Sequence, residues 1–572
     1  MASEAGVLEL GQRLGFRSRV CQVTGLRVDW AAERLITVNA VTAVVFLLVG
    51  GVMALFVSMT RWPAVGLLSG NPELFYRFLT AHGMNMLVYW IIFFEVAGLY
   101  FGGAVPLNAR LVTPWLAWLG YALMLAGALL GNATVLSGRA DVMWDAYVPL
   151  ETPPAFFLSY IIFAAGALVA CYVFFATVIV AKVEGRYRGS LPLVTYGFAT
   201  AAIIAVVTLL GGVFTFVPAF FWSLGLMHED PEAYRLTIWL LGHGTQQINL
   251  AAMVSVWYLI AYLAVGAQPV SEKLSRLAFV LYILFINLGS VHHLLVDPGL
   301  SRSFKYWNTS YAMYAAVLGS MIHAFSIPAA VEVAQRAKGY TRGLFEWLRK
   351  APWGNPAFAG AALSLLGFGF IGGTTGVAFG HGPTSILHHN TIAIPGHFHA
   401  TVVLGTTLAF MGVTYYVLPL VCRRKVVGWR LAQVQPYIFA LGVALLAVAL
   451  MNAGAQFGVP RRVVSIAYQG APFPVHFPAA AYRALNLAGV GAVLALVGGA
   501  LYIGIAVSTL IWGERIPAGA GPLMEQQAEE PTGAEARLHI PGTVVLVSVF
   551  LLFFIGVLVA NMGSLLYLWP VH

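Results

Sequence analysis

Six histidines lie inside long apolar stretches of the chain, where polar and ionisable side chains are costly and usually functional. They form a pair, a His-x-His motif and two single residues: His82, His243, His292, His293, His397 and His399. Imidazole suits copper and iron, including haem iron. Four positions after His243 stands Gln247, on the same face of a helix. These residues predict two haems and a third metal buried in a membrane.

The spacing of the histidines divides them into separate ligand sets. On an α-helix, residues i and i+2 point about 200° apart, so His397 and His399 cannot bind the same metal. Each can be the axial ligand of a separate haem. His82 can complete the second axial position of one haem, which leaves the other haem open. The remaining three histidines can then bind a non-haem metal, copper or iron, that faces the open position.

The composition predicts that these histidines are positioned by a membrane bundle. The chain has 572 residues, of which 60% are hydrophobic and 9% are charged, whereas soluble proteins have about 25% charged residues. We count thirteen apolar runs of about the 20 residues needed to cross a bilayer. Backbone groups in hydrocarbon must be satisfied within the segment, which favours helices. The expected fold is all-α, a polytopic bundle of about 13 transmembrane helices.

Four segments follow from this pattern. We expect a cytoplasmic N-terminal segment at 1–36, a twelve-helix haem-binding core at 37–512, a polar cytoplasmic loop at 513–540 and an additional C-terminal transmembrane helix at 541–572. The three cysteines are far apart and predict neither a disulfide framework nor a thiolate metal site.

The distribution of basic residues predicts the orientation in the membrane. The net charge is +9, and most Lys and Arg lie in the N-terminal segment and in the loops after even-numbered helices. Basic loops face the cytoplasm, so the N-terminus is expected inside and no nucleic-acid partner is inferred. This orientation brings all six histidines to a similar depth in the outer half of the bilayer.

Five motifs resemble the catalytic subunit I of the haem-copper oxidase superfamily, in its B-family branch. They are TAHGMN around His82, GHGTQQ around His243, VHHLLVDPG around His292, HNTIAIPGHFH ending at His399, and VPRR ending at Arg462. They extend over most of the chain, and the last His-containing motif is highly specific. A thirteenth helix also fits this branch.

The resemblance implies a role for each motif. His82 and His399 would bind a low-spin haem, His397 a high-spin haem, and His243, His292 and His293 the distal metal, iron or copper. Arg461 and Arg462 resemble the pair that neutralises haem propionates, for which the planar guanidinium is suited. His389 and Asn390 resemble part of the same propionate cluster. A small subunit II with a copper centre or a c-type haem is the expected electron donor, in a bacterial or archaeal inner membrane.

The chain departs from the family at Gln247. Oxygen reductases of the B family have a tyrosine there, which supplies an electron and a proton, and Gln247 cannot be oxidised in this way. Tyr282, ten residues before His292, is about 15 Å along a helix and too far to replace it. Nitric oxide reductases of the superfamily also lack the tyrosine. We therefore predict reduction of 2 NO with 2 electrons and 2 protons to N2O and water, with oxygen reduction as the alternative.

Two further expectations concern Glu95 and a different class of protein. Glu95 is the acid most clearly inside a span, and a buried carboxyl group can pass protons.

The alternative to an enzyme is a transporter or channel that has interior histidines and no haem. The absence of a haem absorption band would favour this alternative.

Overall fold

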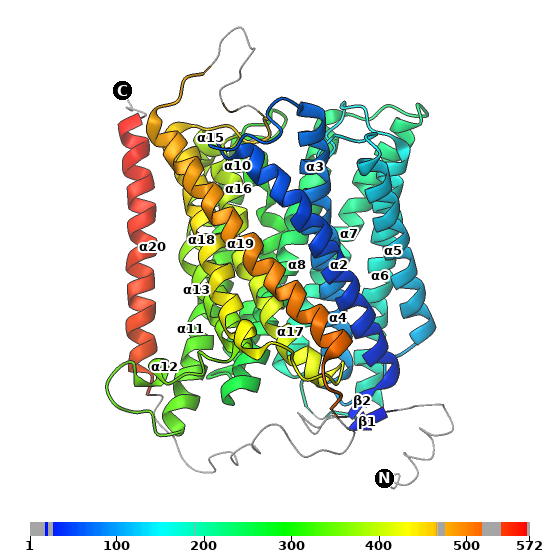
Figure 1. Ribbon diagram of the computed structural model, residues 1–572, viewed down its shortest axis with the longest axis vertical. Helices are drawn as coiled ribbons and strands as arrows, with labels where there is room; N and C mark the ends of the chain where they lie inside the picture. Colours follow the sequence, from blue (N-terminus) through cyan, green and yellow to red (C-terminus); the bar gives the residue numbers. More distant parts are fainter. Residues whose placement is uncertain are drawn as a thin grey trace.

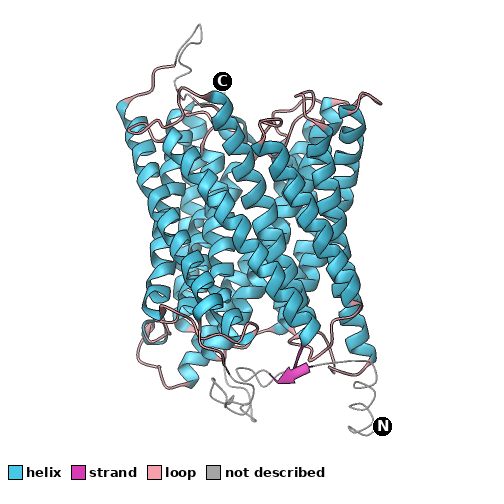
Figure 2. Ribbon diagram, turned by 45° about the vertical axis from the view of Figure 1, so that its right-hand side comes forward, coloured by secondary structure: helices cyan, strands magenta, loops and turns pink. Residues whose placement is uncertain are grey.

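The computed structural model of the chain is a bundle of long helices that run between two faces of the molecule (Figures 1 and 2). It describes residues 18–20, 27–187, 189–464, 466, 475–516 and 539–568, without the side chains of 20, 27, 286, 287 and 561–568. Most of the predicted N-terminal segment and of the predicted loop at 513–540 lies outside these residues. Within them the all-α prediction is confirmed.

The elements are named in chain order. They are β1 (Ser18–Val20), β2 (Arg27–Asp29), α2 (Trp30–Arg61), α3 (Pro72–Met84), η1 (Asn85–Tyr89), α4 (Trp90–Ala104), α5 (Pro114–Leu136), α6 (Pro154–Val183), α7 (Leu193–Ser223), α8 (Pro231–Val265), α9 (Glu272–Leu281), η2 (Tyr282–Ile286), η3 (Asn287–His293), α10 (Arg302–Trp307), η4 (Asn308–Ala312), α11 (Met313–Ala337), α12 (Glu346–Arg349), α13 (Pro356–Gly367), η5 (Phe368–Gly373), α14 (Thr374–Gly380), α15 (Gly382–His388), α16 (Ala393–Phe398), η6 (His399–Thr407), α17 (Leu408–Leu420), α18 (Trp429–Phe457), α19 (Ala479–Trp512) and α20 (Pro541–Leu568).

Twelve of the described helical segments are long and apolar enough to cross a membrane. The thirteenth apolar run, predicted at 275–296, is a broken helix: α9 ends at Leu281 and continues as the π-helical turn η2 and the 3-10 helix η3. Sequence periodicity did not reveal this break, because every residue in the run is compatible with a helix.

Polar side chains and prolines define where the helices begin. Asp29 accepts a hydrogen bond from the Ala32 backbone and so caps α2, which starts seven residues before the predicted position 37. Asp230 caps α8 in the same way, with Pro231 in the first turn. The short β1–β2 hairpin lies at the lower end of the bundle (Figure 2).

Small residues allow neighbouring helices to approach closely. A Cβ on Gly166 of α6 would collide with the backbone of α5, and one on Gly491 of α19 would collide with the backbone of α18. Such contacts drive helix packing where lipid supplies no hydrophobic force. The last helix, α20, is the exception, because few of its residues are buried and it lies along the outside of the bundle (Figure 1).

Candidate metal centre

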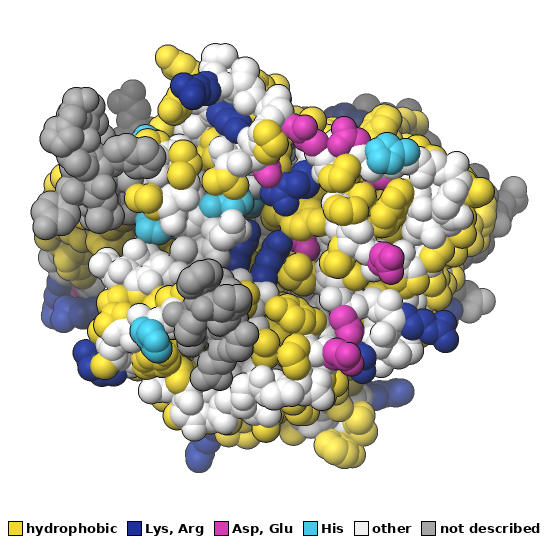
Figure 3. Space-filling model, turned by 90° about the horizontal axis from the view of Figure 1, so that it is seen from above, with side chains coloured by type: hydrophobic (Ala, Val, Ile, Leu, Met, Phe, Trp, Pro, Cys, Tyr) yellow, Lys and Arg dark blue, Asp and Glu magenta, His cyan; other side chains and the backbone are white. Residues whose placement is uncertain are grey.

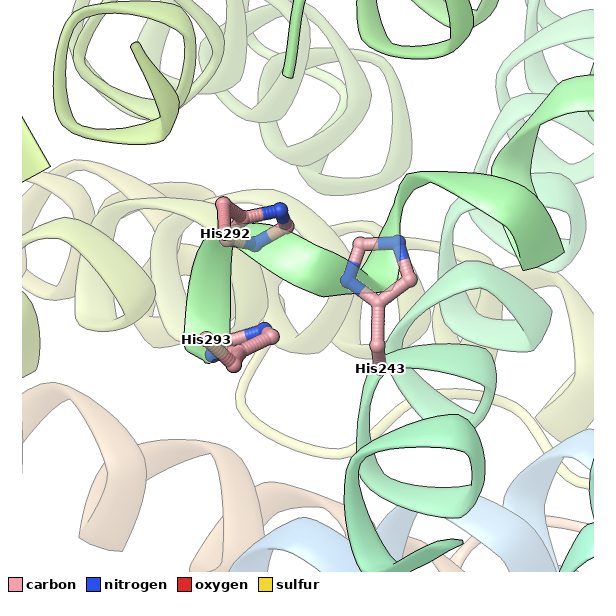
Figure 4. Close-up of side chains that lie close together, drawn as sticks. All are labelled: His243, His292 and His293. Atoms are coloured by element: carbon pink, nitrogen blue, oxygen red, sulfur yellow. The ribbon is translucent and has the colours of Figure 1, made fainter. Parts of the chain in front are cut away.

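Three histidines from two segments converge on one point. His243 lies on α8, and His292 and His293 lie at the end of η3 (Figure 4). One ligand nitrogen from each lies within 4.8 Å of the others. Nitrogens that bind one ion at about 2.0–2.1 Å are separated by at most about 4.2 Å. A displacement of less than about one ångström would therefore close the set around a metal.

The break after α9 positions the histidine pair. Asn308 of η4 donates a hydrogen bond to the Leu288 carbonyl oxygen and accepts one from the Val291 backbone at 3.3 Å. This side chain satisfies backbone groups that a continuous helix would have paired internally. The ring of His293 also stacks on Trp239 of α8, with ring centres 3.9 Å apart and planes inclined by 6°.

His82 and His399 form a second, facing pair. Their ring centres lie 6.4 Å apart and their planes are inclined by 16°. Two imidazoles on opposite sides of one metal, each with its nitrogen about 2 Å from the ion, have ring centres roughly 6 Å apart. The Nδ1 atoms donate to the carbonyl oxygens of Gly50 at 3.1 Å and Pro395 at 2.7 Å. This tautomer leaves each Nε2 unprotonated, as a metal ligand requires.

His397 is held apart from this pair. Its Nδ1 donates to Thr375 Oγ1 at 3.1 Å, and that hydroxyl donates to the Ile371 carbonyl oxygen at 2.5 Å. Nε2 is again the nitrogen available for a metal. A Cβ on Gly376 would lie 3.0 Å from His397 Cε1, so glycine is needed for this close approach of α14.

One internal cavity of about 780 Å³ connects all six histidines. Its walls are largely apolar, and the polar residues that line it include the six histidines, Gln247, Arg461 and Arg462. Ligand cavities in proteins have this character and usually 300–1,000 Å³. The cavity therefore has the size and character of a binding site for an organic cofactor.

The two arginines lie at the rim of the cavity. Arg462 forms an ion pair with Asp145, whose side chain is fully buried. Arg461 donates its backbone N–H to the Asn390 carbonyl oxygen at 3.0 Å, whereas its buried Nε has no hydrogen-bond partner among the described residues. A buried donor without an acceptor is costly, and a carboxylate of a bound cofactor would satisfy it. Seen from above, basic, acidic and histidine side chains gather near the centre of this face (Figure 3).

The ionisable groups at the rim of the cavity have pKa values shifted in different directions. Burial and then the charge of Arg462 lower the pKa of Arg461 to about 10. Burial lowers the pKa of Arg462 as well, but the interactions of Arg462 with Asp145 and Tyr147 have the larger effect. The pKa of Arg462 therefore lies above its ordinary value. Burial and then Arg461 lower the pKa of His389 to about 4, so His389 is a neutral hydrogen-bonding group at physiological pH.

The remaining predicted residues have different positions. Gln247 lines the cavity, and its Nε2 lies 3.3 Å from His243 Nε2. His389 is buried and also lines the cavity, but the side chain of Asn390 is exposed and only its backbone contacts Arg461. Glu95 is buried on α4, beside a separate small cavity.

Several supporting residues were not predicted. Thr375, Trp239 and Asn308 orient the ligands, and Asp145 neutralises Arg462. Each of these residues stands alone in an apolar segment or a loop, so no sequence motif identifies it. The one usable signal was Asn308, an amide inside a predicted span.

Comparison with known proteins gives a consistent result. The sequence model of the family described as cytochrome c and quinol oxidase polypeptide I matches residues 34–494. The chain is 31% identical to cytochrome c oxidase subunit 1 of Thermus thermophilus over 502 residues, which cover 83% of this chain and 85% of that protein. It is 25% identical to cytochrome c oxidase subunit 1 of Thermostichus vulcanus over 452 residues, or 74% and 75% of the two chains.

A solved structure has the same fold. It is the cryo-EM structure of a heme-copper terminal oxidase dimer, with a TM-score of 0.80 and 24% sequence identity. The similarity covers 94% of this chain and 93% of that chain. The path of the chain is thus similar over nearly its whole length.

Proposed function

Because the chain belongs to the cytochrome c and quinol oxidase polypeptide I family, we propose that it is the catalytic subunit of a membrane terminal oxidase that reduces dioxygen to water. The observation that supports dioxygen best is the 31% identity to a cytochrome c oxidase subunit 1 along 85% of its length. Our sequence-based preference for nitric oxide has no support from the names of these relatives and becomes the second candidate.

The donor sets fit two haems and one further metal. His82 and His399, whose nearly parallel rings face each other, would hold one haem, His397 would hold the other through its Nε2, and the three converging histidines would hold iron or copper. When bound, the haems and the metal supply the electrons that reduce the gas. Arg461 would pair its free Nε–H with a haem propionate.

The protein residues have three tasks in this proposal. Backbone carbonyls and Thr375 fix the tautomers of His82, His399 and His397, so each of these histidines presents an unprotonated Nε2 to a metal. The apolar wall of the cavity excludes bulk water and admits a small uncharged gas. Trp239 and Asn308 keep the histidine pair in place.

Nitric oxide reduction is the second candidate, and Gln247 is the observation that favours it. Its amide lies beside the nitrogen of His243 that faces η3, at the position where a redox tyrosine is expected in B-family oxygen reductases. An amide can donate a hydrogen bond to a bound NO oxygen but cannot supply an electron. Tyr282 lines the same cavity and bonds Ser320 at 2.9 Å, so the cavity wall still contains a phenol.

The setting follows from the same family membership. We propose a complex with a subunit II that contains a copper centre or a c-type haem, in a bacterial or archaeal inner membrane. The N-terminus is proposed to face the cytoplasm, which places the histidine layer near the outer surface. The extra helix α20 supports the B-family branch.

Gas consumption by the purified complex distinguishes the candidates. Reduced donor with oxygen should give rapid oxygen uptake, and anaerobic incubation with NO should give little N2O. Robust N2O formation without oxygen uptake would instead establish nitric oxide reduction. Absence of a haem absorption band would reject both in favour of a transporter.

A further inference from the structure

Glu95 is a buried carboxyl group that forms no ion pair with any described residue. It lies on α4 with 4% of its surface exposed. An ionised carboxylate in such surroundings is strongly unfavourable, so the group holds a proton at rest.

Asn249 of α8 provides its polar contact. With the amide nitrogen toward α4, Asn249 donates to Glu95 Oε1 at 2.7 Å and to the Thr245 carbonyl oxygen at 3.2 Å. In the reverse orientation Asn249 Oδ1 would face the Thr245 carbonyl oxygen, which has no proton to share, although Asn249 Nδ2 would then donate to Gln246 Oε1 at 3.2 Å. Asn249 is itself 1% exposed, so a buried amide is directed at a buried acid.

Gln246 extends this contact to the large cavity. With the Asn249 amide nitrogen toward α4, Oδ1 of Asn249 lies 3.2 Å from Oε1 of Gln246, and the two amides form a hydrogen bond when the Gln246 amide is also turned so that its nitrogen donates. Residues i and i+3 share a helix face, so the two amides are stacked along α8. Gln246 lines the cavity that contains the metal-binding histidines. Glu95, Asn249 and Gln246 thus form a polar ladder through apolar surroundings.

Glu95 also lines a second, small cavity. This cavity has about 30 Å³ and is bounded by residues that include Ile36 and Val417, which are near the lower ends of α2 and α17 (Figure 1). A cavity of this size has room for one water molecule, and Glu95 is the one polar residue among those that line it, so a water would occupy it only transiently. Glu95 therefore contacts both this small cavity and the ladder that leads to the metal centre.

We propose that Glu95 delivers protons to the metal centre, with Asn249 and Gln246 as positioning residues. This inference rests on the proposed function in one respect: the reduction of dioxygen and the reduction of nitric oxide both consume protons. The O–H bond of Glu95 breaks, and its proton passes to a water beside the ladder and then to the oxygen of the reduced gas. A proton from the aqueous phase at the lower face returns to the carboxylate, relayed by a water that enters the 30 Å³ cavity transiently. No electron passes through Glu95, and the amides keep their own protons.

The test is single-turnover proton uptake by the complete, haem-loaded complex. Glu95→Gln keeps the size and the hydrogen bond to Asn249 but cannot release a proton in this way. Proton uptake, followed with a pH-sensitive dye, should slow at least tenfold, while the haem spectrum and carbon monoxide binding stay unchanged. Asn249→Leu should slow uptake less, and Asn249→Gln should restore part of it. Wild-type uptake rates in Glu95→Gln would overturn the proposal.

A matched control separates this effect from loss of any buried acid. Glu332 of α11 is also fully buried, but it pairs with Arg336 at 2.7 Å, so Glu332→Gln should leave proton uptake at the wild-type rate. Equal slowing in both variants would overturn the proposal. If Glu95→Gln fails to retain haem, Glu95→Asp takes its place and should show slowed uptake, since the shorter side chain loses contact with Asn249. A wild-type complex that reduces neither gas would refute the proposed function instead.

Discussion

Gln247 Nε2 lies 3.3 Å from His243 Nε2, and both side chains face the cavity that contains the other metal-binding histidines. The two residues are one helical turn apart on α8, so the amide follows the histidine wherever the helix places it. A bound gas on the metal would therefore meet an amide, which can form hydrogen bonds but cannot be oxidised by one electron. This single contact separates the chain from an oxidase with a tyrosine at the same position.

The first prediction concerns this amide. Gln247→Leu keeps a similar volume but removes the hydrogen bond, which is worth about 1 kcal/mol and corresponds to roughly fivefold in rate. We expect turnover of the physiological gas to fall by about that factor, with both haem signals retained. Steady-state gas consumption provides the measurement. Gln433→Leu, on α18 outside the cavity lining, should have no effect.

The second prediction separates the two haem ligands. His399 faces His82, whereas His397 is bonded to Thr375 on a different side. His399→Ala should remove the low-spin haem signal and His397→Ala the high-spin signal. Optical and electron paramagnetic resonance spectra of each variant provide the measurement. Loss of the low-spin signal in His397→Ala would contradict the assignment.

The helices and the histidine ligands could be predicted from the sequence, whereas the residues that hold the histidines in position could not. Hydrophobic length alone predicts most spans, and the similar depth of the histidines follows from topology. The break between α9 and η3 was missed because it depends on Asn308, a side chain from the following helix. The stacking of Trp239 on His293 was missed for the same reason. Such contacts depend on tertiary packing, which periodicity does not encode.

The third prediction concerns the buried ion pair at the rim. Arg462→Gln leaves Asp145 buried without its cation, and breaking a buried pair in this way costs about 3 kcal/mol or more. We expect a clear decrease in the thermal unfolding temperature of the detergent-solubilised complex. Adding Asp145→Asn should recover part of the loss.

Arg77 provides the matched control. It pairs with Asp141 at 3.3 Å, but both side chains are 24% exposed. A pair in which solvent reaches both side chains contributes about 0–1 kcal/mol, so Arg77→Gln should lower the unfolding temperature less than Arg462→Gln does. A similar decrease in both variants would mean that burial of Asp145 does not decide the effect.

The last prediction concerns pH and the cap of α2. Asp29 is 5% exposed and accepts hydrogen bonds from the backbone of Leu111 at 2.9 Å and of Ala32 at 3.4 Å. Burial raises its pKa above 3.8, although these backbone hydrogen bonds oppose the shift. The folded state therefore binds more protons than the unfolded state from pH 3.8 up through the raised pKa, and stability falls as pH rises across this window.

Asp29→Asn removes the titration but keeps an oxygen that can cap the helix. The free energy of unfolding of the variant, relative to wild type, should therefore increase from acidic pH to neutral pH. Thermal unfolding at pH 4 and pH 7 provides the comparison, with Asp141→Asn as a control whose carboxylate is partly exposed. A constant difference between Asp29→Asn and wild type at both pH values would show that the cap carboxyl group titrates alike in the folded and unfolded states.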